Sequence, residues 1–186
     1  NAGIMQPERL GANRTPLSVA EDTIATNLLG PIRMTHALMP QLLRQASARI
    51  ITVTSGLAFV PLAVTPTYSA TKAAIHSWTQ SLRSQLEATN ISVHELAPPG
   101  VQTDLMPGHR TSPHAMPFDA FIDEVMSILG QDPVPDEILV DPLRFGHPDV
   151  VLQPGRRRLV VGQSAEQGQG RMAVGVDQAG AEQDVR

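Results

Sequence analysis

Apolar residues follow two different periods along this chain, and the two periods alternate. The segment Arg49–Thr54 is short, almost continuously apolar and β-branched, which is typical of a parallel strand covered on both faces. Ile91–Leu96 predicts a second strand and Glu137–Val140 a last one. Longer stretches with helical spacing lie between these runs. Strands that alternate with helices favour an α/β fold with a parallel sheet.

The first helical stretch covers residues 18–45. Ser18 is a candidate N-cap, with Glu21 three residues later as in a capping box. Pro31 falls inside this stretch and has no N–H to offer the carbonyl of Asn27, so that acceptor is freed. The pattern leaves two interpretations open: a functional carbonyl at Asn27, or a simple kink in a surface helix.

A second helical stretch, residues 68–88, carries an apolar stripe that predicts either core packing or a subunit interface. Its members are Ile75, Trp78, Leu82 and Leu86. Residues 118–129 predict a third, amphipathic helix. The segment between Met106 and Pro117 is rich in Pro, His and Ser, which suits a mobile lid over a substrate.

Tyr68 and Lys72 are four residues apart on the second helix, so the phenol and the ammonium share one face. A free tyrosine has a pKa of about 10, and acid–base work near neutral pH requires lowering it by roughly 3. A positive charge about 4 Å away contributes on the order of 4 kcal/mol at an effective dielectric near 20, which is the required scale. We therefore expect Lys72 to lower the pKa of Tyr68.

Ser55 follows the strand predicted at Arg49–Thr54 and so stands at its carboxyl end. Open parallel sheets bind ligands at that edge. A hydroxyl there can hold and polarise a reacting oxygen while the phenol transfers a proton. The three groups together predict a proton-transfer site used in redox chemistry.

These residues resemble the short-chain dehydrogenase/reductase family, whose active site combines Asn, Ser and Tyr-x-x-x-Lys on a Rossmann-type sheet. Four segments match in order. Asn1-Ala2-Gly3-Ile4 resembles the end of the family's Asn-Asn-Ala-Gly motif, and Thr26-Asn27-Leu28-Leu29-Gly30-Pro31 resembles the helix that carries its catalytic asparagine. Ser55 resembles the catalytic serine, and Leu96-Ala97-Pro98-Pro99-Gly100-Val101-Gln102-Thr103 resembles the Pro-Gly loop. Gly30-Pro31 and the segment 135–140 also resemble a bacterial subgroup, the DltE-like oxidoreductases.

The resemblance implies an oxidoreductase that moves a hydride between NAD or NADP and a carbonyl or alcohol substrate. Tyr68 would transfer the proton, Lys72 would contact the nicotinamide ribose, Ser55 would hold the substrate oxygen and Asn27 would support a water relay. It further implies a cofactor-binding set of Asn1, Ala2, Gly3, Tyr68, Lys72, Pro99, Gly100, Val101 and Thr103. A homodimer through the helices at 18–45 and 68–88 is implied in the same way.

The family's glycine-rich turn, T-G-x-x-x-G-x-G, does not occur in this sequence. We therefore expect a three-layer Rossmann-type α/β fold with its N-terminal strands missing, in which residues 1–146 form the catalytic portion. Because such glycines let the backbone approach the pyrophosphate, we expect this chain alone to bind the cofactor poorly. Residues 147–186 are rich in Gly and Gln without periodicity, which predicts a disordered or non-family tail.

Composition narrows the function classes. The net charge is −4 and the pI about 5.8, so no basic surface favours nucleic acid or anionic lipid. The absence of Cys excludes thiolate metal sites, and the six His show no zinc-binding spacing, so we expect no metal site. No run of eighteen apolar residues occurs, and a cytoplasmic location is expected.

Two rival functions use the same features. Ser69-Ala70-Thr71-Lys72 also fits S-x-x-K, the nucleophile motif of penicillin-recognising acyl-transfer enzymes, although no S-D-N or K-T-G follows. The other rival is a cofactor-free fragment that serves as a binding or dimerisation module, which the absent glycine-rich turn favours.

Overall fold

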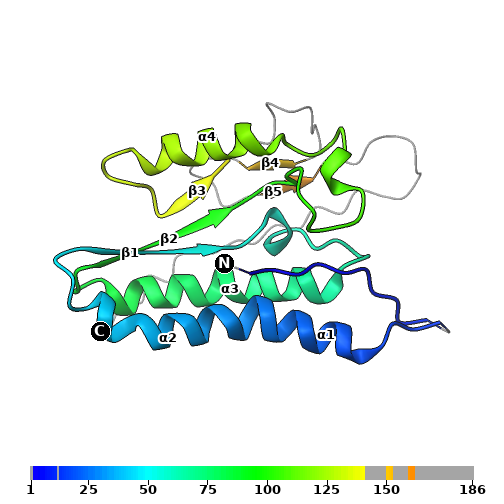
Figure 1. Cartoon of the computed structure of the whole chain (residues 1–186), viewed down its shortest axis with the longest axis horizontal. Helices are drawn as coiled ribbons and strands as arrows, with labels where there is room; N and C mark the ends of the chain where they lie inside the picture. Colours follow the sequence, from blue (N-terminus) through cyan, green and yellow to red (C-terminus); the bar gives the residue numbers. More distant parts are fainter. Residues whose placement is uncertain (1, 12, 141–149, 153–158, 162–186) are drawn as a thin grey trace, which may run out of the picture.

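A three-stranded parallel sheet forms the centre of the computed structural model, which describes residues 2–11, 13–140, 150–152 and 159–161 (Figure 1). The strands are β1 (Ala48–Val53), β2 (Ile91–Ala97) and β3 (Glu137–Leu139), in the order β1-β2-β3. All three run in one direction, as the sequence predicted. Their carboxyl ends therefore meet at one edge of the sheet.

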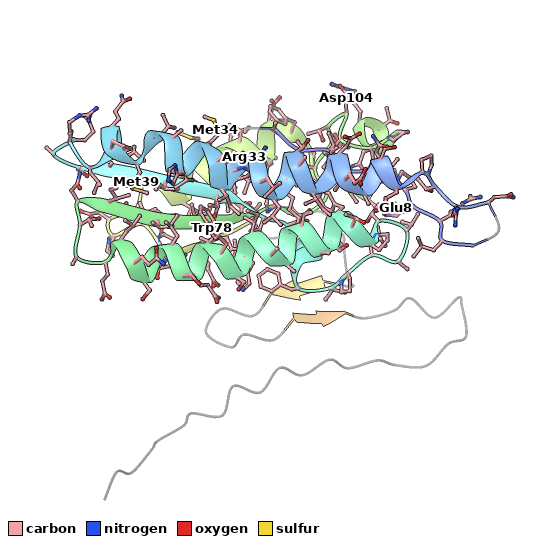
Figure 2. All side chains as sticks on the ribbon, turned by 90° about the horizontal axis from the view of Figure 1, so that it is seen from below. Glu8, Arg33, Met34, Met39, Trp78 and Asp104 are labelled. Carbon is pink, nitrogen blue, oxygen red and sulfur yellow. The ribbon has the colours of Figure 1, made fainter. Side chains whose placement is uncertain are left out.

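Helices cover both faces of this sheet. On one face, α1 (Leu17–Ile24), a π-helical turn (Ala25–Leu29) and α2 (Gly30–Leu42) follow one another directly and lie beside α3 (Pro66–Leu86) (Figures 1 and 2). On the other face lies α4 (Phe118–Leu129). This helix–sheet–helix arrangement confirms the predicted Rossmann-type α/β fold. None of the helices in the described ranges has the length and apolarity needed to cross a membrane.

The first helix starts and ends earlier than predicted. It begins at Leu17, and the N-cap position belongs to Pro16, which makes no side-chain cap hydrogen bond. The Ser18 capping box is therefore wrong, because Ser18 already lies inside the helix. The fixed backbone of Pro16, with φ of −55°, lets the helix start directly after it. At the other end, α2 stops at Leu42 instead of residue 45.

The strand β1 is less covered than its apolar sequence suggested. It stands at the edge of the sheet, and the side chains of Arg49 and Ile51 are exposed while Thr52 is buried. In the first half of β1, only the side chains that face α3 are packed. The prediction of a strand covered on both faces is wrong there, because α4 lies over β3 at the opposite edge.

Two apolar clusters hold the layers together. The one between the sheet and the α2–α3 pair is built from Leu82, Leu86, Ile91 and Val93, with Met39 and Trp78 packed against it (Figure 2). The one under α4 contains Met116, Val125 and Val140. The predicted stripe on the second helix is thus core, with Trp78 at its half-buried margin.

A short antiparallel pair follows the main sheet in sequence: β4 (Val150–Leu152) and β5 (Leu159–Val161). The predicted boundary at residue 146 and most of the predicted tail, 147–186, lie outside the described residues. Disorder of that tail stays a prediction.

Leu82→Ala is expected to lower the free energy of unfolding by about 2–5 kcal/mol, because it opens a cavity in the cluster beneath α3. Leu10→Ala is a matched control, since that side chain is 87% exposed, and should change stability by less than about 0.5 kcal/mol. Denaturant unfolding followed by the fluorescence of Trp78, the single tryptophan, measures both. Equal midpoints for the two variants would contradict this core.

Candidate active site

The carboxyl ends of β1 and β2 carry the two loops that the sequence analysis singled out. Ser55 comes two residues after the end of β1, and the Pro98-Pro99-Gly100 loop follows β2. The loops are joined directly, because Gly56 N donates to Pro98 O at 3.2 Å. A side chain from either loop therefore faces the same edge of the sheet, where parallel α/β folds bind ligands.

Ser55 and Tyr68 come together at this edge, where the Ser55 hydroxyl acts on the Tyr68 phenol. Ser55 is extended and caps a short 3-10 turn, Gly56–Ala58, by accepting from Leu57 N at 3.2 Å. Tyr68 lies in the first turn of α3, and only 5% of it is exposed. Burial raises the pKa of Tyr68 above its ordinary value, and the Ser55 hydroxyl opposes that rise.

Lys72 lies one turn further along α3 and is almost fully buried. Its ammonium donates to Val53 O at 2.9 Å and lies 5.4 Å from the centre of the Tyr68 ring. Burial lowers the pKa of Lys72 to about 8. The prediction that Lys72 lowers the Tyr68 pKa is wrong, because desolvation raises that pKa and the ammonium is directed at the backbone carbonyl of Val53.

Asn27 is buried within the π-helical turn and ties the first helix to the N-terminal segment. Its side-chain oxygen accepts from Ile4 N at 2.9 Å, and its nitrogen donates to Ile4 O at 2.8 Å. Gly30 N donates to Ala25 O, the i to i+5 bond of a π turn, and Pro31 follows it. Single π turns of this kind occur frequently at functional sites.

The remaining predicted cofactor residues are placed as follows. Ala2 and Gly3 are exposed beside Asn27, whereas Asn1 lies outside the described residues. Gly100 is exposed on the loop after β2, Pro99 is half-buried and Val101 is buried. Thr103 is half-buried, and its hydroxyl accepts from Leu105 N at 3.4 Å. The segments before Ile4 and after Pro98 thus both present backbone close to the candidate catalytic groups.

The predicted lid, residues 106–117, is anchored at its far end to the loop after β2. Met116 N donates to Gly100 O at 2.7 Å, and Gln102 N donates to Met116 O at 2.8 Å. Its beginning turns at Gly108, whose φ of 79° suits glycine. Movement of the segment over a substrate stays a prediction.

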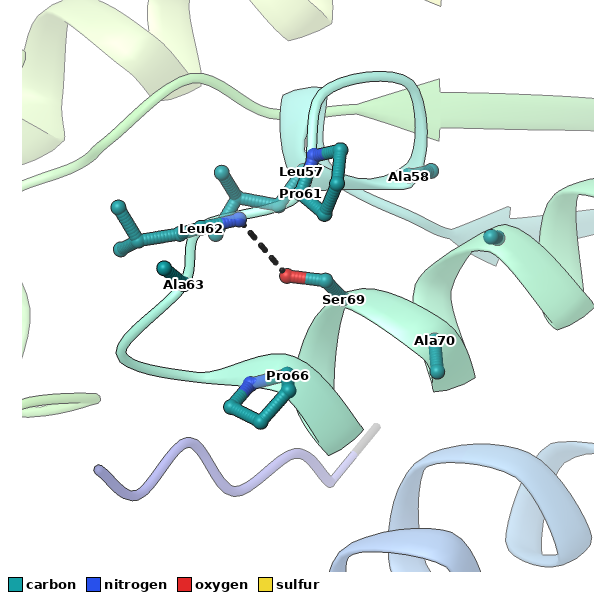
Figure 3. A pocket seen from close by; sticks show the side chains of 9 residues that line it. Leu57, Ala58, Pro61, Leu62, Ala63, Pro66, Ser69 and Ala70 are labelled. Carbon is teal, nitrogen blue, oxygen red and sulfur yellow. Dashed lines mark hydrogen bonds between the residues drawn. The ribbon is translucent and has the colours of Figure 1, made fainter. Parts of the chain in front are cut away.

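Ser69 does not form a nucleophile pair with Lys72. Its hydroxyl donates to Thr65 O at 3.1 Å and accepts from Leu62 N at 3.2 Å (Figure 3). It lines an apolar pocket of about 380 Å³ together with Leu57, Ala58, Pro61, Leu62, Ala63, Pro66, Ala70 and Ala73. Neither Tyr68 nor Lys72 lines this pocket, because they project from another face of α3. The S-x-x-K interpretation loses its geometric basis.

Sequence reasoning missed two residues at this edge. Glu95 is 1% exposed in the middle of β2, and His76 contacts its carboxylate from α3. The available signals were a glutamate inside the apolar run 91–97 and a histidine four residues after Lys72. In the part of the chain that the structure describes, no group of three or more His, Asp or Glu side chains could hold a metal ion.

Comparison with known proteins decides the family. Residues 1–113 match the model of the short chain dehydrogenase family. The chain belongs to this family. It is 46% identical over 105 residues to the uncharacterized oxidoreductase DltE of Bacillus subtilis, a match that covers 56% of this chain and 42% of that protein. The match agrees with the predicted subgroup.

Two further relatives extend the likeness. Mouse estradiol 17-beta-dehydrogenase 2 is 30% identical over 145 residues, covering 76% of this chain and 37% of that protein. A short chain dehydrogenase from Burkholderia cenocepacia, solved in complex with NADP, superposes with a TM-score of 0.64 at 26% identity, covering 74% of this chain and 55% of that one. The chain thus spans about half or less of the length of these relatives.

The buried Lys72 should make stability depend on pH. Its folded pKa, about 8, lies below the value of 10.5 for an exposed lysine, so between these values the unfolded state binds more protons and stability rises with pH. Lys72→Met should remove this rise. Denaturant midpoints of both chains at several pH values above neutrality measure it. Parallel pH curves for the two chains would show that the ammonium is not buried as described.

Proposed function

We propose that this chain carries the proton-transfer half of a nicotinamide-dependent oxidoreductase that interconverts a carbonyl and an alcohol. The observation that carries the proposal is the placement of Ser55 beside Tyr68 at the carboxyl edge of the sheet, with Lys72 one turn away on the same helix and its ammonium 5.4 Å from the centre of the Tyr68 ring. Membership of the short chain dehydrogenase family and the NADP complex of the Burkholderia relative support the choice of cofactor class.

The donor set fits the nicotinamide end of such a cofactor. Two hydroxyls and an ammonium converge at an edge where Gly100 and Gly3 are exposed and leave the backbone open. Ala2, Gly3, Pro99, Gly100, Val101 and Thr103 would line it, and Lys72 would reach the ribose. When bound, the nicotinamide supplies or accepts the hydride. NAD and NADP remain equal choices, and we propose a small-molecule substrate.

Tyr68 is the proton donor in the proposed reduction. Its phenol is neutral in the folded chain, since burial raises its pKa, and so it holds a proton to give. Ser55 lies beside that phenol and would hold the substrate oxygen next to it. The pKa of Lys72 is about 8, so its ammonium releases a proton more readily than that of an exposed lysine. Lys72 can therefore return a proton to Tyr68 at neutral pH. Asn27 fixes the backbone at Ile4 and would support the water relay.

Assembly into a homo-oligomer through the first helical layer and α3 is part of the same proposal. Apolar side chains at Met34 and Leu38 of α2 are exposed one turn apart, which supports a further contact there. A cytoplasmic location, likewise, is an expectation from composition.

Tyr68→Phe tests the catalytic assignment in a chimera that places the N-terminal part of the Bacillus relative before Asn1. Carbonyl reduction should fall by about 10²–10⁴-fold, because the proton donor is lost, while NADPH binding followed by its fluorescence stays near normal. Ser69→Ala is the control and should keep turnover. Near-normal turnover of Tyr68→Phe, or its loss only in Ser69→Ala, would refute the proposal.

The chain by itself should bind NADH or NADPH weakly, because it contains no glycine-rich turn for the pyrophosphate. Fluorescence titration of the purified chain against the chimera measures the difference. Sub-micromolar binding by the chain alone would show that its own residues suffice for the cofactor.

A further inference from the structure

A buried carboxylate lies in the central strand of the sheet, next to the candidate active site. Glu95 belongs to β2, which is flanked by β1 and β3, and only 1% of it is exposed. Burying an ionised carboxylate is unfavourable unless hydrogen bonds replace the lost water. Its partners therefore show what it holds in place.

Glu95 accepts hydrogen bonds from two different elements. His76 Nδ1 on α3 lies 2.8 Å from Oε2 and 2.9 Å from Oε1. The Thr54 hydroxyl, directly after β1, donates to Oε1 at 2.7 Å. The carboxylate thus bridges the helix that carries Tyr68 and the strand end that carries Ser55.

The imidazole of His76 is itself held on several sides. Its Nε2 lies 3.1 Å from the amide nitrogen of Gln80, and its ring meets that of Phe59 edge-on at 4.7 Å between centroids. A neutral ring with its proton on Nδ1 satisfies both contacts, donating to Glu95 and accepting from Gln80. The pair is therefore a fixed support for the carboxylate, since the ring has little freedom to turn.

The Thr54 hydroxyl is one of three consecutive attachments at the end of β1. Val53 O accepts from Lys72, the Thr54 hydroxyl donates to Glu95, and the Ser55 hydroxyl lies beside the Tyr68 phenol. The backbone of Thr54 is also held to β2, because its N–H donates to Leu96 O at 2.8 Å. Since Thr54 and Ser55 share a peptide, a displaced Thr54 would move the Ser55 hydroxyl relative to the phenol.

We propose that Glu95 and His76 are positioning residues for the Ser55–Tyr68 pair, and that they act through Thr54. This positioning role depends on the proposed function in one respect only: the proposed function gives the Ser55–Tyr68 pair its reaction. Hydrogen bonds to a carboxylate are shorter and stronger than those between neutral groups, so they fix direction as well as distance.

A neutral contact elsewhere on the same helix shows that attaching β1 to α3 does not by itself require a carboxylate. Thr52 and Thr79 join the strand and the helix through their hydroxyls at 2.8 Å, and Thr52 also lies within 3.4 Å of His94 O. Thr79 is as buried as Glu95, and its contact on β1 is Thr52, three positions before Ser55. Thr79→Val is therefore a matched control for general loosening of this interface.

The single tyrosine makes the proposal testable in the chain itself. The absorbance of tyrosinate, followed as pH is raised, reports Tyr68 alone, and Trp78 fluorescence shows that the chain is folded at each point. Ser55→Ala should raise the Tyr68 pKa, because it removes the hydroxyl that opposes the effect of burial on that pKa. Thr54→Val and His76→Leu should raise it in the same direction, whereas Thr54→Ser, His76→Asn and Thr79→Val should leave it unchanged.

Three results would overturn the proposal: no change with Ser55→Ala, no change with Thr54→Val and His76→Leu, or an equal change with Thr79→Val. His76 is half-buried on the helix surface, so its variants decide the matter if the buried Thr54→Val does not fold.

Turnover in the chimera gives the second measurement. His76→Leu should lower kcat for carbonyl reduction by about 10²-fold, the effect of a misplacement of about 1 Å, with the KM for NADPH unchanged. His76→Asn should restore it, because its amide nitrogen replaces Nδ1. An equal loss in both His76 variants would overturn the positioning role. Absence of turnover in every chain would instead refute the proposed function, while the tyrosine titration still tests the positioning.

Discussion

The site depends on one constraint: the polar side of α3 must lie against the carboxyl end of β1. Three contacts make this attachment, one at each of three consecutive residues, Val53 to Ser55, at the end of β1 and directly after it. Their partners are Lys72 of α3, Glu95 with His76 of α3, and Tyr68 of α3. Lys72, Glu95 and Tyr68 are buried, so each unmade bond there would be costly. The strand end is therefore held as a unit.

Burial of Tyr68 and Lys72 suits the proposed chemistry and opposes stability at the same positions. It keeps the phenol of Tyr68 protonated and weakens the hold of Lys72 on its proton. Both directions suit a site in which a phenol donates and an ammonium replenishes. An exposed pair would be more stable but would keep the ordinary pKa values of the two groups. The apolar clusters on both faces of the sheet supply the stability that the polar interface lacks.

The family relation explains why this part of the chain is organised around the edge of the sheet. Residues 1–113 match the short chain dehydrogenase model. They bring together an asparagine on a π turn, a serine after a strand and a tyrosine and lysine on a helix. The chain spans 42% of its Bacillus relative. In the proposed function, these residues handle the proton and the nicotinamide end of the cofactor.

The sequence by itself determined which elements form, and it brought Asn27, Ser55, Tyr68 and Lys72 forward as a group. Periodicity, spacing and ordered motifs are local properties, so they can be read without coordinates. The start of the first helix was predicted wrongly, because Pro16 replaced the expected cap at Ser18. Only the tertiary structure decided the electrostatics, since desolvation depends on what covers a side chain. It alone revealed Glu95 and His76, which are nineteen positions apart in sequence and 2.8 Å apart in space.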